Sequence, residues 1–128
     1  MPLLQVDDKT VEVPQGRRLV LAIKEAGVHI GHRCGGYAKC TTCRVEVVSG
    51  EPDSMTRGEY AKLRERELLG QYRLSCQLVC DHDIHVRSLM TLENQDWTDT
   101  GPPPEPVVMP EAVWYPREQL EREALAGA

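Results

Sequence analysis

The 128-residue sequence lacks the features that mark several common protein classes. Basic residues are not in excess: 15 Lys and Arg face 20 Asp and Glu, a formal net charge of −5. Nucleic-acid binding, which needs clustered cations, is therefore not expected. No apolar run approaches the roughly 20 residues of a membrane span. Residues 1–8 lack the basic flank and apolar stretch of a secretory signal. We expect a cytoplasmic protein that binds neither nucleic acid nor a membrane.

Motifs for catalysis are also missing. The sequence offers no nucleophile–base pair, no phosphate-binding loop and no motif of paired carboxylates. We predict a protein that is not an enzyme.

Charge and proline are unevenly placed along the chain. Residues 1–92 hold 12 acidic and 13 basic side chains, whereas residues 93–128 hold 8 acidic and 2 basic ones. The second segment also contains both tryptophans, Trp97 and Trp114, and six of the nine prolines. All five cysteines precede it. Composition thus divides the chain into a cysteine-bearing domain, 1–92, and a proline-rich acidic C-terminal extension, 93–128.

Hydrophobic periodicity predicts a small α+β domain. Two short strands, 3–6 and 10–13, flank a polar turn and form a hairpin. Apolar residues spaced as on one helix face predict a helix over 19–26, ended by Gly27. Alternation predicts two later strands, at 44–47 and 84–87.

A second helix is expected between those later strands. Thr56 and Glu59 have the spacing of a capping box, and Tyr60, Leu63 and Leu68 give the helix one apolar face. The resulting order is strand, strand, helix, strand, helix, strand, which is a small mixed sheet crossed by one main helix.

The extension has little pattern until its end. Its proline-rich residues 101–106 should be extended, because proline excludes helix and central strand there. Pro116 suits the first turn of a helix that runs to about Ala126 and ends at Gly127.

The cysteine spacing indicates a four-sulfur site. Cys34, Cys40 and Cys43 fall within ten residues, and Cys76 follows after a gap of thirty-two. Zinc and iron–sulfur clusters both use such sets. A zinc knuckle usually needs two close Cys-x-x-Cys pairs, and this chain has one, so an iron–sulfur cluster is favoured.

The residues around the cysteines suit such a cluster. Gly35 and Gly36 let the chain wrap closely and turn N–H groups inward. Thr41, Thr42 and Ser75, each beside a cysteine, can donate hydroxyl hydrogen bonds to sulfur.

The run Cys34-Gly-Gly-Tyr-Ala-Lys-Cys40-Thr-Thr-Cys43, with the later Arg73-Leu-Ser-Cys76-Gln, resembles the 2Fe–2S ferredoxin family. Its first gap is similar to that of the adrenodoxin-type branch. The run Cys-Thr-Thr-Cys-Arg-Val also resembles ferredoxin domains joined to bacterial nucleotide cyclases. The resemblance covers about residues 1–92 and implies a β-grasp fold and one 2Fe–2S cluster. It implies that Cys34, Cys40, Cys43 and Cys76 bind the cluster, with Cys34 and Cys40 on the more exposed iron.

Two positions depart from that family pattern. Adrenodoxin-type proteins typically have His after the third ligand, where this chain has Arg44. They also carry an acidic partner-binding stretch before the fourth ligand. The corresponding residues 51–69 have a net charge of only −1. This departure weakens the expectation that the chain docks a basic partner through that stretch.

Other candidate residues have plainer interpretations. We expect Cys80 to be a small buried hydrophobe, with a fourth ligand or a reactive thiol as the alternatives. His32 is expected to be a solvated loop residue, with a place at the cluster rim as the alternative. Arg33 and Lys39 flank the cysteine run. Their alternative roles are to balance the charge of a cluster, to bind an acidic partner, or simply to be solvated.

The sequence leaves two classes of function. The first is a one-electron carrier between a reductase and an acceptor enzyme. The second is a cluster- or zinc-stabilised binding or regulatory module whose extension mediates partner or self association. We hypothesise that Trp97, Trp114 or Tyr115 packs on the chain's own domain or on a second copy, giving a homodimer. A disordered acidic tail is the competing prediction.

Overall fold

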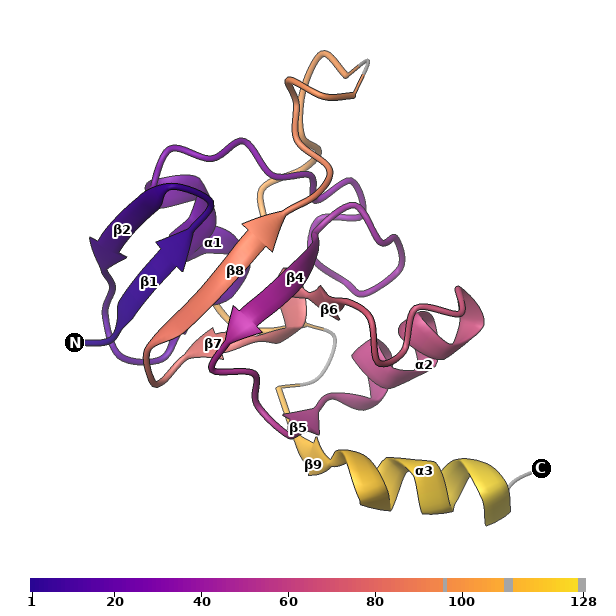
Figure 1. Cartoon of the computed structure of the whole chain (residues 1–128). Helices are drawn as coiled ribbons and strands as arrows, with labels where there is room; N and C mark the ends of the chain where they lie inside the picture. The colour runs from indigo at the N-terminus through magenta and orange to yellow at the C-terminus, as the bar shows by residue number, and fades with distance from the viewer. Residues whose placement is uncertain (96, 110–111, 127–128) are drawn as a thin grey trace.

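A five-stranded mixed sheet forms the centre of the molecule (Figure 1). The computed structural model describes residues 1–95, 97–109 and 112–126. Strands β1 and β8 run parallel, and the other neighbouring strands run antiparallel. In sheet order the strands are β2 (Lys9–Glu12), β1 (Leu3–Val6), β8 (Ile84–Ser88), β4 (Arg44–Ser49) and β6 (Arg73–Leu74).

Helix α1 (Leu19–Glu25) covers one face of this sheet. Its stripe of Leu19, Ala22 and Ile23 is fully buried against the inward side chains of the strands. Gly27 follows with φ +93, the left-handed conformation that ends the helix. The predicted α+β arrangement of the β-grasp type, with one main helix on a small mixed sheet, is confirmed.

Strand boundaries differ slightly from the expected ones. Asp7 adopts φ +55, so the hairpin turn takes only Asp7 and Asp8, and Lys9 already pairs with Val6. The strand predicted over 10–13 therefore starts one residue earlier and ends at Glu12. Strand β4 extends beyond its predicted end, because the bulge between Val47 and Ser49 lets it keep pairing with β8.

Helix α2 (Arg57–Glu65) begins as predicted. The Thr56 hydroxyl accepts a hydrogen bond from the backbone N–H of Glu59 at 3.1 Å. The helix ends before Leu68, however, because Glu67 takes φ +57 and breaks the helical path. The turn still directs Leu68 onto the core.

Strand β6 of the sheet, two short strand pairs and one 3₁₀ turn were not predicted. Strand β3 (Arg17–Arg18) pairs with β7 (Val79–Cys80), and β5 (Ser54–Met55) pairs with β9 (Tyr115–Pro116). The 3₁₀ turn η1 (Ser75–Gln77) directly follows β6. These pieces are too short to show a periodicity. They place the segment after β6 beside the start of α1.

The extension runs from the end of β8 to the opposite end of the sheet (Figure 1). Its helix α3 (Arg117–Ala126) starts beside the predicted Pro116, and its expected stop at Gly127 lies outside the described residues. Along the described chain, no helix has both the length and the apolar character needed to cross a membrane.

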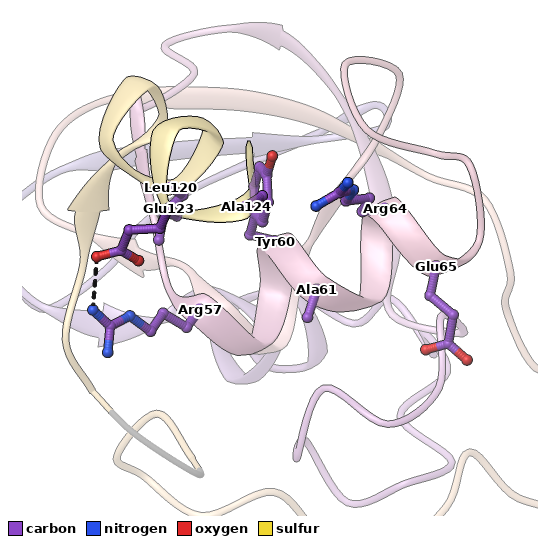
Figure 2. Close-up of a pocket in the computed structure, with 8 residues that line it drawn as sticks. All are labelled: Arg57, Tyr60, Ala61, Arg64, Glu65, Leu120, Glu123 and Ala124. Atoms are coloured by element: carbon purple, nitrogen blue, oxygen red, sulfur yellow. Dashed lines mark hydrogen bonds and ion pairs between the residues drawn. The ribbon is translucent and has the colours of Figure 1, made fainter. Parts of the chain in front are cut away.

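Helix α3 lies against α2 (Figure 2). Leu120 is buried between the two helices at 3% exposure, and Arg57 pairs with Glu123 at 3.0 Å. The Arg57 guanidinium also lies 4.4 Å from the centre of the Tyr115 ring. An open groove of about 610 Å³ remains between the helices, and no cysteine lines it.

Candidate metal centre

The structure brings the four predicted cysteines together in two pairs. Cys34, Cys40 and Cys43 lie in the loop of residues 31–43, here named the cysteine loop, between α1 and β4. Cys76 lies in η1. The Cys34 and Cys40 thiols share a hydrogen bond and are half-buried. The Cys43 and Cys76 thiols share another and are fully buried.

The more exposed pair is surrounded by backbone donors. The hydrogen bond with Cys40 lowers the pKa of the Cys34 thiol to about 4, against the opposing effect of burial. Backbone N–H groups of Lys39, Cys40 and Tyr37 act in the same direction, and the Tyr37 N–H lies 3.3 Å from the Cys34 sulfur. The same shared hydrogen bond raises the pKa of Cys40. The loop therefore aims its amides at sulfur and favours thiolate there.

The buried pair is tuned in a similar way. The hydrogen bond with Cys43 is the main reason that the pKa of the Cys76 thiol is lowered, against burial. The Gln77 side chain, the Ala38 backbone N–H and the charge of Arg18 lower it further. Hydrogen bonding to Cys76 and burial raise the pKa of Cys43. Donors from the cysteine loop and from η1 thus converge on one site.

One of the three predicted hydroxyl contacts to sulfur is present. Thr42 Oγ1 lies 3.1 Å from the Cys40 sulfur. Ser75 instead donates to the Cys43 carbonyl at 2.8 Å, and Thr41 contacts the Arg44 guanidinium. Arg44 also donates to the Thr41 carbonyl at 2.9 Å, so it braces the end of the cysteine loop.

Cys80 lies apart from this site. It is on β7, 1% exposed, with a pKa raised to about 12 chiefly by burial and also by the charge of Asp81. A thiol at that pKa stays protonated near neutral pH. The expectation of a small buried hydrophobe is confirmed.

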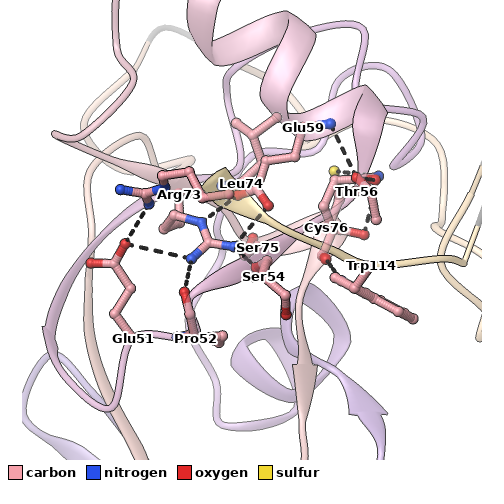
Figure 3. Close-up of polar contacts among 12 residues, drawn as sticks. Glu51, Pro52, Ser54, Thr56, Glu59, Arg73, Leu74, Ser75, Cys76 and Trp114 are labelled. Carbon is pink, nitrogen blue, oxygen red and sulfur yellow. Dashed lines mark hydrogen bonds and ion pairs between the residues drawn. The ribbon is translucent and has the colours of Figure 1, made fainter. Parts of the chain in front are cut away.

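A buried ion pair anchors the segment that carries Cys76 (Figure 3). The Glu59 carboxylate accepts from Arg73 at 2.8 and 3.0 Å and from the backbone N–H of Leu74 at 2.8 Å. Arg73 also donates to the carbonyls of Pro52 and Ser54. The predicted capping box is therefore only half formed, because the Glu59 side chain fixes β6 instead of returning to Thr56.

A second buried arginine joins three segments at the site. Arg18 is fully buried and donates to the Cys76 carbonyl at 2.8 Å and to the Gly36 carbonyl. It also donates to the carbonyls of Glu105 at 2.8 Å and Val107 at 3.2 Å. Gly36 is required here for two reasons. Its φ is +87, and a Cβ would lie 2.7 Å from the Arg18 guanidinium.

The extension covers His32, which the sequence predicted to be solvated. That prediction is wrong: the ring is 1% exposed and bonds the Pro102 carbonyl at 2.9 Å and the Thr100 hydroxyl at 3.0 Å. Burial, with a smaller effect from Lys24, lowers the pKa of His32. His32 therefore has a neutral, structural role under the extension.

Both tryptophans of the extension contact the domain. The Trp97 ring fills the space where a side chain on Gly31 would project, and Arg33 lies 5.4 Å from its centre. Trp114 Nε1 donates to the Gln77 carbonyl at 2.9 Å. With Tyr115, these residues pack on the chain's own domain, the first of the two arrangements hypothesised. The competing prediction of a disordered tail is wrong for the described part, and the homodimer is left without support.

The donor set fits a two-iron cluster. Across residues 1–95, 97–109 and 112–126, no three His, Cys, Asp or Glu side chains converge as ligands of one metal ion. Two sulfur pairs with inward N–H donors match a 2Fe–2S cluster, in which each iron takes two protein ligands.

Comparison with known proteins gives the same assignment. Residues 4–81 match the model of the 2Fe-2S iron-sulfur cluster binding domain. Over 80 residues the chain is 34% identical to a component of the Na(+)-translocating NADH-quinone reductase of Chlamydia felis, covering 62% of this chain and 18% of that relative. The chain spans only about a fifth of the length of such curated relatives.

Several solved structures are similar, including the following two. The ISC-like 2Fe-2S ferredoxin of Pseudomonas putida has a TM-score of 0.56 at 29% identity, covering 68% of this chain and 91% of that one. A cytochrome P450 reductase of Amycolatopsis has a TM-score of 0.55 at 25% identity, covering 70% of this chain and 26% of that one. The chain thus belongs to the family of 2Fe-2S iron–sulfur cluster binding domains, and its cofactor is one 2Fe-2S cluster.

Proposed function

We propose that the chain is a one-electron carrier, without catalytic activity of its own, that moves electrons between a reductase and an acceptor enzyme. Cys34, Cys40, Cys43 and Cys76 would hold the cluster. The observation that carries the proposal is the pairing of these sulfurs among inward backbone donors. Related proteins with reductase names support redox partners in general.

The bound cluster takes up and gives back one electron. The protein's part is to hold the sulfurs, limit water and leave one side open. Cys34 and Cys40 are half-buried, whereas Cys43 and Cys76 are enclosed. Electrons would therefore enter and leave on the Cys34–Cys40 side. Lys39 is exposed beside that pair and provides a cationic contact for an acidic patch on a partner.

The alternative of a zinc-stabilised binding module has less support. A zinc staple needs four ligands around one ion. The thiols are instead grouped two and two, Cys34 with Cys40 and Cys43 with Cys76.

Serine variants of the cysteines test the ligand set. The purified protein should be coloured, with about two irons and two sulfides per chain. Cys34→Ser, Cys40→Ser, Cys43→Ser and Cys76→Ser should each lose most of the visible absorbance. Cys80→Ser is the matched control and should keep it, because Cys80 lies apart on β7. A colourless protein with one zinc, or loss of colour in Cys80→Ser alone, would contradict the proposal.

Electron transfer is tested separately. The dithionite-reduced protein should reduce cytochrome c with one electron per cluster and regain its oxidised spectrum. If the cluster-loaded protein cannot be reoxidised by cytochrome c, the proposed ligand set stands but the proposed role as an electron carrier is contradicted.

A further inference from the structure

Arg18 is a buried cation without an acidic partner. Its side chain is fully enclosed, and its hydrogen bonds in the described structure all go to backbone carbonyls. Two other arginines do have an acidic partner: Arg17, its neighbour in the sequence, and Arg73, which is also buried. Arg17 pairs with Glu25 at 2.5 Å, and Arg73 pairs with Glu59 at 2.8 Å. Within residues 1–95, 97–109 and 112–126, no carboxylate lies within ion-pair distance of Arg18.

A buried charge needs compensation. Taking an ion out of water costs several kcal/mol even after the protein relaxes, so enclosed charges are normally paired or bind metal sites. Carbonyl dipoles satisfy the Arg18 donors but carry no net charge. The enclosed guanidinium therefore needs an anion from another source.

The cluster site supplies that anion. Arg18 bonds the carbonyl of one proposed ligand, Cys76, and that of Gly36 within the cysteine loop. We propose that Arg18 is a positioning residue whose guanidinium is the buried counter-charge of the cluster. The same guanidinium holds the extension over the cluster through its hydrogen bonds to the carbonyls of Glu105 and Val107. This inference rests on the proposed function.

The sign of the effect follows from charge. Two ferric ions, two sulfides and four thiolates leave two negative charges, and reduction adds a third without a proton. A nearby cation stabilises the reduced form more than the oxidised form, so it raises the reduction potential. Burial strengthens this effect, because the screening by water is weak there.

The chain offers a matched control for this charge. Arg18→Gln removes the buried charge, Arg18→Lys keeps a charge but loses the planar fork, and Arg17→Gln removes a charge on the neighbouring, partly exposed residue. The potential of each loaded protein is measured by spectroelectrochemical titration. Arg18→Gln should lower the equilibrium constant for reduction about tenfold or more, about 59 mV for one electron. Arg17→Gln and Arg18→Lys should stay within about threefold of the parent.

The lysine variant separates charge from structure. Both Arg18 variants lose bonds to Glu105 and Val107, so hydrogen exchange of those residues should rise in both. If loosening of the extension set the potential, Arg18→Lys would shift it as much as Arg18→Gln does, and the counter-charge role would be overturned. An unchanged potential in a loaded Arg18→Gln would also overturn it.

Cluster assembly gives a second readout. If Arg18→Gln fails to bind the cluster, Arg18→Lys decides. A loaded Arg18→Lys with the reduction potential of the parent supports the role of charge. A tenfold fall in its equilibrium constant for reduction refutes that role. Failure of the proposed function is distinguishable, because the parent protein itself would then show no cluster or no reoxidation.

Discussion

Two arginines flank the segment that carries Cys76, and their surroundings differ. Arg73 is 2% exposed and neutralised by Glu59, which is itself fully buried. Arg18 is equally enclosed but faces carbonyls and the sulfur site. The first arginine therefore holds the segment in place whether or not the cluster is bound, whereas the second depends on the cluster for its counter-charge.

Glu59→Gln should destabilise the protein by about 3 kcal/mol, because it leaves Arg73 enclosed without its main counter-charge. The midpoint of thermal unfolding, followed by far-UV circular dichroism, should fall by about 10 °C. The visible absorbance should bleach at the same lower temperature, since Cys76 follows the anchored Leu74.

Glu65→Gln is the control for that substitution. Glu65 pairs with Lys62 at 2.8 Å on the exposed side of the same helix. Exposed pairs contribute little, so its unfolding midpoint should match that of the parent. Equal midpoints for the two variants would show that the buried pair does not hold the segment.

At the scale of elements, Leu120 is the buried apolar contact of α3, and Ala124 is partly buried against the core. Leu120 is 3% exposed against α2, and truncation of a buried leucine costs about 2–5 kcal/mol. Leu120→Ala should release α3, so trypsin should cleave faster after Arg117 and Arg122. Glu121→Ala changes an exposed residue of the same helix, and trypsin should cleave this variant at the parent rate. Equal rates for the two variants would mean that the remaining contacts, such as those of Arg57 and the pairing of β5 with β9, hold the helix without Leu120.

The elements predicted from sequence are those with local causes. The hairpin, α1, the Thr56 cap and β8 each follow from periodicity or from a cap within a few residues. The two-residue strands were missed, because β5 finds its partner β9 about sixty residues away, and such pairs have no period.

The cysteine set was also visible in the spacing, because few folds use four thiols in that arrangement. The contribution of the extension was not. Arg18, His32 and Gln77 bind it through backbone carbonyls, and a carbonyl has no side-chain signature. A cation directly before the apolar stripe of α1 was the one hint that Arg18 is special.

At the scale of the whole molecule, the extension is acidic but contacts the site through neutral groups. Glu105 offers its carbonyl to Arg18 and keeps its side chain exposed. Pro104 is buried over Gly36, and Pro102 lies over Gly35. The extension can therefore shield the cysteine loop without placing a carboxylate next to a negatively charged cluster, which would oppose reduction.

This arrangement ties the cysteine loop, the extension and the cluster into one cooperative unit. Removing iron with acid and chelator should free the paired sulfurs and leave Arg18 without its counter-charge. Hydrogen exchange measured by mass spectrometry should then accelerate in residues 31–43 and 97–109 together, and reconstitution with iron and sulfide should reverse it. The ladder between β1 and β8 is the internal control and should stay protected, because neither strand carries a proposed cluster ligand. An extension that keeps its protection while the loop opens would show that Trp114 and α3 hold it independently of the cluster.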